Sequence, residues 1–263
     1  MNKGFIVAVA LLRTCITHTM KAIRSTIPFA LLGCVWLLAW HLCGSTLVPP
    51  PTAVAERLAR MSLDAGAYLD VFMTLWRGLV GLALAALAAY AIGIACGLCR
   101  PLMEMVSPLV AVLQSCPPIV WISLLMVWVS IGSAIPVAVV CSSSFPVIFI
   151  NIANGVSGID ARFLEMARIY KVPRMRILRR LVLPAIAGSS KSAFAFAIGI
   201  TWKVTATAEF FGARNGIGAR IQLAFQRLDM PGLFAWTFII ALLGMLLDVL
   251  LRGRMPASAG KAG

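Results

Sequence analysis

The residue types that carry out chemistry are sparse in this sequence and do not gather in catalytic patterns. Gly188-Ser-Ser-Lys191-Ser192 resembles the end of a phosphate-binding loop, but it lacks the glycine directly before the lysine and the glycine that begins such a loop. Cys96-Gly-Leu-Cys99 is a C-x-x-C pair in an apolar segment, without a companion pair or a nearby histidine. The sequence therefore predicts no catalytic residues, no ATP hydrolysis, no metal site and no cofactor in this chain itself.

A second group of polar or irregular residues lies inside long apolar segments. Adjacent prolines, Pro117 and Pro118, leave backbone carbonyls without helical donors, which is tolerated where protein or a water-filled cavity covers them. A simple kink against a neighbouring helix is the alternative. Lys203 is costly within an apolar segment and should snorkel, pair or face water. Serine and asparagine can line a route for a polar solute or can be packing contacts between helices. The candidate path residues are Ser115, Pro117, Pro118, Ser143, Asn151 and Lys203.

The longest polar interval, residues 157–184, could bind another protein. Two acids stand in it among seven basic residues. Its first half has apolar residues at the spacing of one helix face, from Ile159 to Tyr170. Pro173 should end that helix near Lys171, because proline supplies no N–H and disfavours the helical conformation in the residue before it. Such a stripe is typical of a docking surface or of a helix that lies on the membrane.

Composition places these residues in a membrane protein. Hydrophobic residues make up 61% of the 263 and charged residues only 12%, against about 45–50% and about 25% in a soluble domain. The formal net charge of +14 does not indicate a nucleic-acid partner, because the basic residues lie between apolar runs, as in loops on the inner side of a membrane. The predicted fold is all-α, with about six transmembrane helices in one domain over residues 27–252.

Six apolar segments are long enough to cross a bilayer core, which needs about 20 residues. Arg77 lies near the outer end of the second and is expected to snorkel. An amphipathic helix over 53–70 is expected on the outer interface. Six crossings leave both termini on one side, and the distribution of Lys and Arg puts segment 1–26, interval 157–184 and a disordered tail 253–263 in the cytosol. The predicted spans are 27–47, 71–98, 107–131, 134–156, 186–211 and 232–251.

At the polar interval the chain resembles permease subunits of bacterial ABC importers, which carry a loop written E-A-A-x3-G-x9-I-x-L-P. Glu165 and Ala167 match the first and third positions of that loop and Leu183-Pro184 the last two, at the family's spacing. Lys171 stands where the family has glycine. In the family this loop is a coupling helix that sits in a groove of the cytosolic ATPase. The resemblance therefore implies ATPase-coupling roles for Ile159, Phe163, Glu165, Ala167, Tyr170, Lys171, Leu183 and Pro184.

The resemblance covers most of residues 47–252 and points to the permeases of the nitrate/sulfonate/taurine/bicarbonate importer group. By resemblance, the assembly is two permeases, here a homodimer, with two cytosolic ATPases and an external solute-binding protein in a bacterial inner membrane. The permeases provide the path through the membrane lipid for a small anionic solute, and closure of the ATPases flips its access. The residues that carry the resemblance are Thr74-Leu-Trp-Arg77-Gly78, Pro117-Pro118, Ala208-Glu209-Phe-Phe-Gly212 and Asn215-Gly-Ile-Gly218.

An ion-coupled secondary transporter is the alternative class. Such transporters usually need carboxylates or broken helices within the membrane to bind the coupling ion. Glu209 and Asp248 are the acidic candidates, and both fall near the ends of predicted spans. A membrane-bound enzyme would need a convergent acid/base or metal set, which the sequence does not offer. An ATPase that co-purifies with the chain would favour the importer.

Overall fold

The computed structural model describes residue 27 and residues 31–252, and the structural statements below concern that part of the chain. The predicted basic segment 1–26 and the predicted tail 253–263 lie outside it. The chain divides into two compact units, Met1–Ala59 and Arg60–Gly263.

The first unit holds an apolar helix followed by a proline-rich turn. The described part of this helix includes Leu31–Cys43, and the predicted first span 27–47 lies partly outside the described residues. The indole N–H of Trp36 donates to the carbonyl oxygen of Pro49 at 3.1 Å, which ties the turn to the helix. Helix α2, Pro51–Met61, then begins at a proline, which suits a first helical turn because its N–H would have no partner there.

A capping aspartate separates α2 from the first long helix. Helix α3 spans Ala65–Leu98. The carboxylate of Asp64 accepts a hydrogen bond from the N–H of Gly66 at 2.9 Å, the usual role of aspartate before a helix. The predicted continuous helix over 53–70 is therefore wrong, because α2 ends at Met61 and a new helix starts after Asp64.

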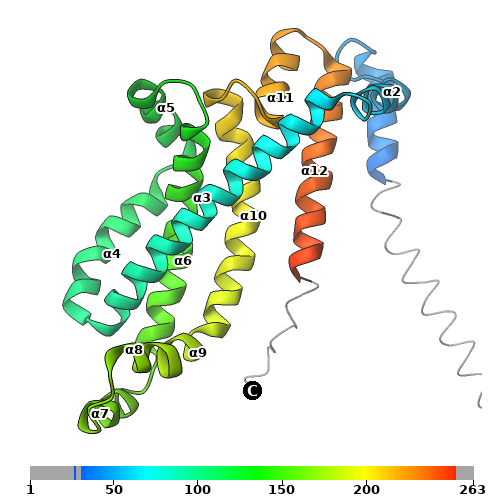
Figure 1. The fold of residues 1–263 in the computed structure, drawn as a ribbon. Coiled ribbons are helices and arrows are strands. Elements are labelled where there is room, and N and C mark those ends of the chain that lie inside the picture. Colours follow the sequence, from blue (N-terminus) through cyan, green and yellow to red (C-terminus); the bar gives the residue numbers. More distant parts are fainter. Residues whose placement is uncertain (1–26, 28–30, 253–263) are drawn as a thin grey trace, which may run out of the picture. The chain divides into compact units, whose positions relative to one another are not determined.

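Helix α3 packs with α6 (Ala134–Ser157) and α10 (Ala187–Gly212) at the centre of the second unit (Figure 1). Glycine allows α3 and α6 to approach closely, since a Cβ atom at Gly97 would lie 2.5 Å from the Cβ atom of Val156. Small residues at such contacts are typical of helix pairs within membranes, where close packing of side chains and backbone drives association.

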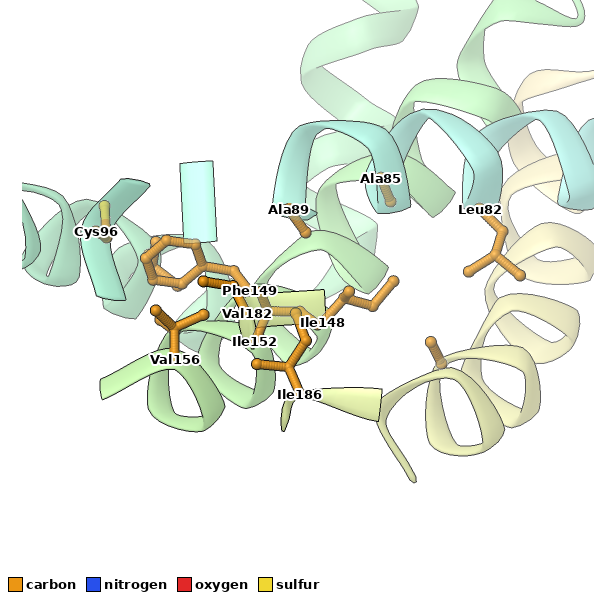
Figure 2. Close-up of a cluster of buried hydrophobic side chains, with 13 residues drawn as sticks. Leu82, Ala85, Ala89, Cys96, Ile148, Phe149, Ile152, Val156, Val182 and Ile186 are labelled. Carbon is orange, nitrogen blue, oxygen red and sulfur yellow. The ribbon is translucent and has the colours of Figure 1, made fainter. Parts of the chain in front are cut away.

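The core of this unit joins small residues on one helix to large ones on the other. Figure 2 shows Phe149, Ile152 and Val156 of α6 in one cluster with Ala85 and Ala89 of α3. All five side chains are buried. Alanines on α3 leave room for the aromatic and branched side chains of α6.

The predicted third span, 107–131, is broken in the middle. Helix α4, Arg100–Ser115, and helix α5, Pro118–Val129, meet at an angle of 93°. Pro117 has an extended backbone and Pro118 begins α5, so neither supplies the N–H that would continue α4. The break fits the predicted irregular backbone and not the alternative of a simple kink, because neither proline offers an N–H group for the helix; the third span itself stays a prediction.

Short helices form the end of the unit at which α10 begins (Figure 1). The predicted interval 157–184 contains α7 (Ala161–Ile169), α8 (Arg174–Ile177), a single π-helical turn η1 (Leu178–Val182) and α9 (Leu183–Ala185). The stretch from Arg174 to Ala185 meets α10 at an angle of 62°. The polar interval therefore turns away from the axis of α10.

The opposite end carries a helix that the sequence did not predict. The segment 212–231, expected as a loop, contains α11, Ile217–Gln226, before α12, Met230–Arg252. Helix α11 packs against both α10 and α12. The glycines at the start of this segment indicated a loop, because glycine is a poor helix former.

The all-α prediction is confirmed for the described residues, which contain helices and no strand. Three described helices, α3, α6 and α12, are long and apolar enough to cross a membrane, or up to five if each bent pair makes one span. The predicted total of about six spans stays a prediction.

Candidate coupling surface and buried ionic network

Helix α7 presents an uncovered apolar stripe. The carboxylate of Asp160 accepts the N–H of Arg162 at 2.9 Å and caps the start of the helix. The exposed fraction of the stripe residues ranges from 51% at Met166 to 79% at Ile169. Residues three or four positions apart share one side of a helix. The stripe consists of Phe163, Met166, Ile169 and Tyr170.

The other predicted coupling residues take different positions. Ile159 precedes α7 and packs against the core cluster, so it does not belong to the exposed stripe. Glu165 is exposed and Ala167 is half-buried. Leu183 and Pro184 are exposed on α9, directly after the buried Val182, which anchors this end of the interval in the core.

Lys171 closes α7 in a conformation that favours glycine. Its φ is +52°, in the left-handed region. The N–H of Lys171 donates to the carbonyl of Arg168 at 3.0 Å, and the N–H of Val172 donates to that of Ala167 at 2.9 Å. These two bonds form the Schellman motif that commonly ends helices with a glycine at the left-handed position. The sharp turn of the resembled loop is thus present, although lysine replaces glycine, and Pro173 only begins the next helix.

Five of the six predicted path residues lie on four different helices, and Pro117 lies between α4 and α5. Ser115 ends α4 and donates to the carbonyl of Ala111 at 2.8 Å, whereas Asn151 on α6 donates to that of Val147 at 2.8 Å. Both hydrogen bonds close on the residue's own helix, as serine and asparagine side chains often do. Ser143 on α6 is half-buried.

Lys203 is exposed in the middle of α10 and lines a cavity of about 700 Å³ between α10 and α12. Phe196, Gly199 and Trp202 line the same cavity, whereas the other five predicted path residues do not. Within this unit, the structure therefore does not bring the predicted path residues to one cavity.

A buried ion pair joins α3 to α10 at the end of the unit where α11 lies. Nη1 of Arg77 lies 2.7 Å from Oε1 of Glu209, and the side chains are 2% and 0% exposed. The expectation that Arg77 snorkels is wrong, because its guanidinium points to a carboxylate inside the bundle. An unpaired charge at such a site would be costly, whereas a paired and hydrogen-bonded one is tolerated.

Every N–H group of the Arg77 guanidinium has an acceptor. Nη1 donates to Glu209 and to the carbonyl of Asn215 at 2.7 Å, and Nη2 donates to the Asn215 side-chain oxygen. Oγ of Ser133 accepts from Nε at 3.2 Å and from Nη2 at 2.9 Å. Arginine has five N–H donors, so the network leaves none unused. It connects α3, the start of α6, α10 and the turn before α11.

The second carboxylate oxygen of Glu209 is also engaged. It accepts the hydroxyl of Thr74 at 2.7 Å and the N–H of Gly218 at 3.1 Å. The Thr74 oxygen in turn accepts the N–H of Ile217 at 2.8 Å. The first N–H groups of α11 are thereby satisfied by side chains of α3 and α10.

A second acid–base pair holds the start of α11. Asp70 on α3 accepts the N–H of Gly216 at 2.8 Å and lies 2.5 Å from Nε of Arg220. Gly216 has φ +104°, and a Cβ atom there would collide with the Glu209 carboxylate. Only glycine fits both the backbone conformation and the space at this position.

Sequence reasoning did not pair these residues. It expected Arg77 to snorkel and considered Glu209 as an acidic candidate of an ion-coupled transporter. It named Thr74 and Asn215 only as parts of the resemblance. One signal could have predicted the ion pair. Arg77 and Glu209 both lie near the outer end of a predicted span, and charged groups within apolar helices usually pair. Three motifs that carry the resemblance, Thr74–Gly78, Ala208–Gly212 and Asn215–Gly218, meet in one network of contacts.

The chain matches the model of a transport family over residues 81–253. That family is described as "Binding-protein-dependent transport system inner membrane component". The chain belongs to this family. The permease is 24% identical over 228 residues to the putative aliphatic sulfonates transport permease protein SsuC of Bacillus subtilis, covering 84% of this chain and 83% of that protein. It is 26% identical over 241 residues to the nitrate import permease protein NrtB of Leptolyngbya laminosa, covering 88% and 86%.

The fold of the permease is similar to that of a solved transporter chain. A chain of the MetNI methionine ABC transporter in an inward-facing conformation superposes with a TM-score of 0.55 at 18% sequence identity. The match covers 72% of this chain and 96% of that one. The resemblance to importer permeases is confirmed, and the permease is an inner-membrane transport component.

Proposed function

We propose that the permease forms the translocation path for a small anionic solute in an ATP-driven importer. An external binding protein delivers the solute, and cytosolic ATPase subunits drive the cycle. Membership of the binding-protein-dependent family supports this assignment. Relatives named for aliphatic sulfonates and for nitrate support an anionic solute.

The observation that carries the proposal is the exposed stripe on α7. Within the described residues nothing covers Phe163, Met166, Ile169 or Tyr170. Large apolar and aromatic side chains at one exposed face are the usual anchors of a protein–protein interface. A helix that offers such anchors fits a groove in a partner. We assign that partner as the ATPase, with Glu165 at the edge of the contact.

Lys203 supports a path between two copies of the permease. Gly199 and Thr207 lie on the same side of α10 at a spacing of four residues and are also exposed. A face of glycine, lysine and threonine is poorly suited to lipid, because intramembrane charges generally face other helices or water. A second copy opposite this face would enclose a cavity with Lys203 on its wall, where an ammonium group attracts an anion.

The distribution of basic residues supports an orientation in which the interval 157–184 faces the cytosol. The interval 157–184 carries seven basic residues and two acids, which supports a cytosolic location for the interval and, with it, for both termini. Helix α7 then faces the compartment that supplies ATP.

The ion-coupled alternative loses its main support. Both oxygens of the Glu209 carboxylate are engaged by Arg77, Thr74 and the N–H of Gly218. A carboxylate so occupied has no free oxygen for a coupling ion. The side chain of Asp248 lies outside the described residues.

Co-purification tests the proposal. The tagged permease, extracted from its native membrane in a mild detergent, should bring an ATPase subunit with it in about equal amount. ATP hydrolysis by that complex in liposomes should rise when the binding protein and its solute are added. A permease that purifies alone and transports in response to an ion gradient would contradict the proposal.

A further inference from the structure

The segment between α7 and α10 carries several basic residues and no acidic residue that could neutralise them. No acidic residue lies between Glu165 and Glu209 in the sequence, whereas eight basic residues do. Segments 1–26, 28–30 and 253–263, which the structure does not describe, contain no acid either. The positive charge of this segment is therefore available to anionic groups of another molecule.

Three arginines of the segment surround one depression. A cavity of about 340 Å³ on α8 and η1 is lined by Pro173, Met175 and the three arginines. All three are exposed, and each lies three or four residues from another. We call them the arginine patch: Arg176, Arg179 and Arg180.

The opposite side of the same segment is fixed in the core. Ile177 and Leu178 pack against the core cluster, and Val182 belongs to it. The segment is therefore amphipathic: its apolar side is held by the bundle and its arginines point away from it. This arrangement fixes the patch relative to α10, so it is not a mobile basic tail.

The bend keeps the patch close to the first residues of α10. The stretch Arg174–Ala185 meets α10 at 62°, so it runs more across than along the direction of that helix. From Arg180 to Ala187 the chain advances about 10 Å along a helix, which is only about 5 Å along the α10 axis at that inclination. A distance of that size matches the headgroup layer beside the hydrocarbon core.

We propose that the arginine patch binds the phosphate headgroups of anionic phospholipids in the leaflet at this end of α10. Arginine presents a planar array of donors that matches phosphate oxygens in pairs. Clusters of basic residues next to a membrane span attract anionic lipid. A depression with three arginines around it can take one phosphate, while Met175, which is 58% exposed, contacts the apolar part of the lipid. The inference goes beyond solute transport and does not depend on which solute is carried.

Lipid retention tests the proposal. The intact transporter is purified in detergent, incubated with an equimolar mixture of phosphatidylglycerol and phosphatidylcholine, washed, and its bound lipid quantified by mass spectrometry. The parent should retain mainly phosphatidylglycerol. The double variant Arg176→Gln/Arg180→Gln should lose this preference roughly 25-fold, since each of the two basic residues near an anionic surface contributes about fivefold in affinity.

The matched control removes the same charge at the other end of the unit. Arg214 and Arg227 are exposed near the two ends of α11, and Arg214→Gln/Arg227→Gln should keep the preference. Arg176→Lys/Arg180→Lys should keep part of it. Inorganic phosphate at the lipid's concentration should not displace the lipid; equal displacement would mean a site for a soluble anion and would overturn the proposal.

The lipid ratio alone decides the outcome. An unchanged ratio in Arg176→Gln/Arg180→Gln overturns the proposal, and an accompanying loss of the ATPase subunit would then identify the patch as a protein-docking surface. Because co-purification of the ATPase is measured separately, failure of this proposal is distinguishable from failure of the proposed function.

Discussion

Arg77 of α3 and Glu209 of α10 meet inside the bundle across 132 positions of sequence, with 2.7 Å between Nη1 and Oε1. Their side chains are almost completely closed to solvent. Removing one member leaves the other charge buried without its partner, which typically costs about 3–5 kcal/mol. The stability of this end of the unit therefore depends on both residues together.

We expect Arg77→Met to lower the thermal stability of the purified permease severely. Glu209→Gln should lower it less, because the amide remains able to hydrogen-bond Thr74 and Gly218. The double variant Arg77→Met/Glu209→Gln should be more stable than Arg77→Met alone, because no unpaired charge remains. Melting curves of the four proteins in one detergent give the coupling energy of the pair. Equal melting temperatures for the parent and Arg77→Met would contradict a structural role for the pair.

Thr74→Val should destabilise the permease by about 1–3 kcal/mol, because the N–H of Ile217 and one oxygen of Glu209 lose a buried partner. Thr207→Val is the matched control. Its hydroxyl is exposed and bonds only the carbonyl of Lys203 on its own helix, at 2.9 Å, so its effect should stay within about 0.5 kcal/mol. Thermal unfolding compares the two, and indistinguishable losses would exclude the assigned role of Thr74.

Lys171→Gly should stabilise the end of α7 by about 1 kcal/mol, because glycine adopts the left-handed conformation without the cost that a side chain imposes. Hydrogen–deuterium exchange of residues 161–172 should slow. The same substitution at Lys191, which is exposed inside α10, should cost about 1 kcal/mol. Faster exchange of α7 in Lys171→Gly would contradict the assigned helix ending.

Phe163→Asp and Glu165→Lys should leave the permease folded in the membrane while lowering ATP hydrolysis stimulated by solute. Both residues are exposed, so folding is unaffected, whereas a wrong charge in a desolvated docking groove can cost a few kcal/mol. Glu104→Lys on α4, which is also exposed, should hydrolyse ATP at the parental rate. Normal stimulation and normal ATPase yield in both α7 variants would rule out α7 as the docking helix.

Lys203→Met should reduce uptake of the anionic solute while the complex still assembles and keeps its basal ATPase activity. Lys203→Arg should keep part of the uptake, because it preserves the positive charge. Arg227→Met, at an exposed position after α11, should have no effect. Uptake by Lys203→Met at the parental rate would show that the residue does not face the path.

The long helices were predictable because their signal is local. Predicted boundaries for the spans that became α3, α6, α10 and α12 agree within a few residues at most of their ends, since a long apolar run is visible in the sequence itself. The start of α3 is the exception: the predicted span began at 71, whereas the helix begins at Ala65. There the capping by Asp64 determined the boundary, and apolar character did not.

The features that could not be predicted depend on distant partners. A Pro-Pro step is compatible with a kink or a break, and packing decides which occurs at Pro117 and Pro118. Arg77 was expected to snorkel because its partner lies far away in sequence. Helix α11 has a glycine-rich start whose N–H groups are satisfied by side chains of α3 and α10. The stripe on α7 was visible as a pattern, but its exposure required the folded chain.

All N–H donors of the Arg77 guanidinium are used, and this limits how the helices around it can move. The helices joined by this network cannot shift gradually past one another. Because no N–H group is spare, any small shift leaves a buried polar group without a hydrogen-bond partner. We expect α3, α10 and the start of α11 to move as one rigid body during a transport cycle. The hinge would then lie where the backbone already departs from helical geometry, between Ser115 and Pro118, where α4 and α5 meet at 93°.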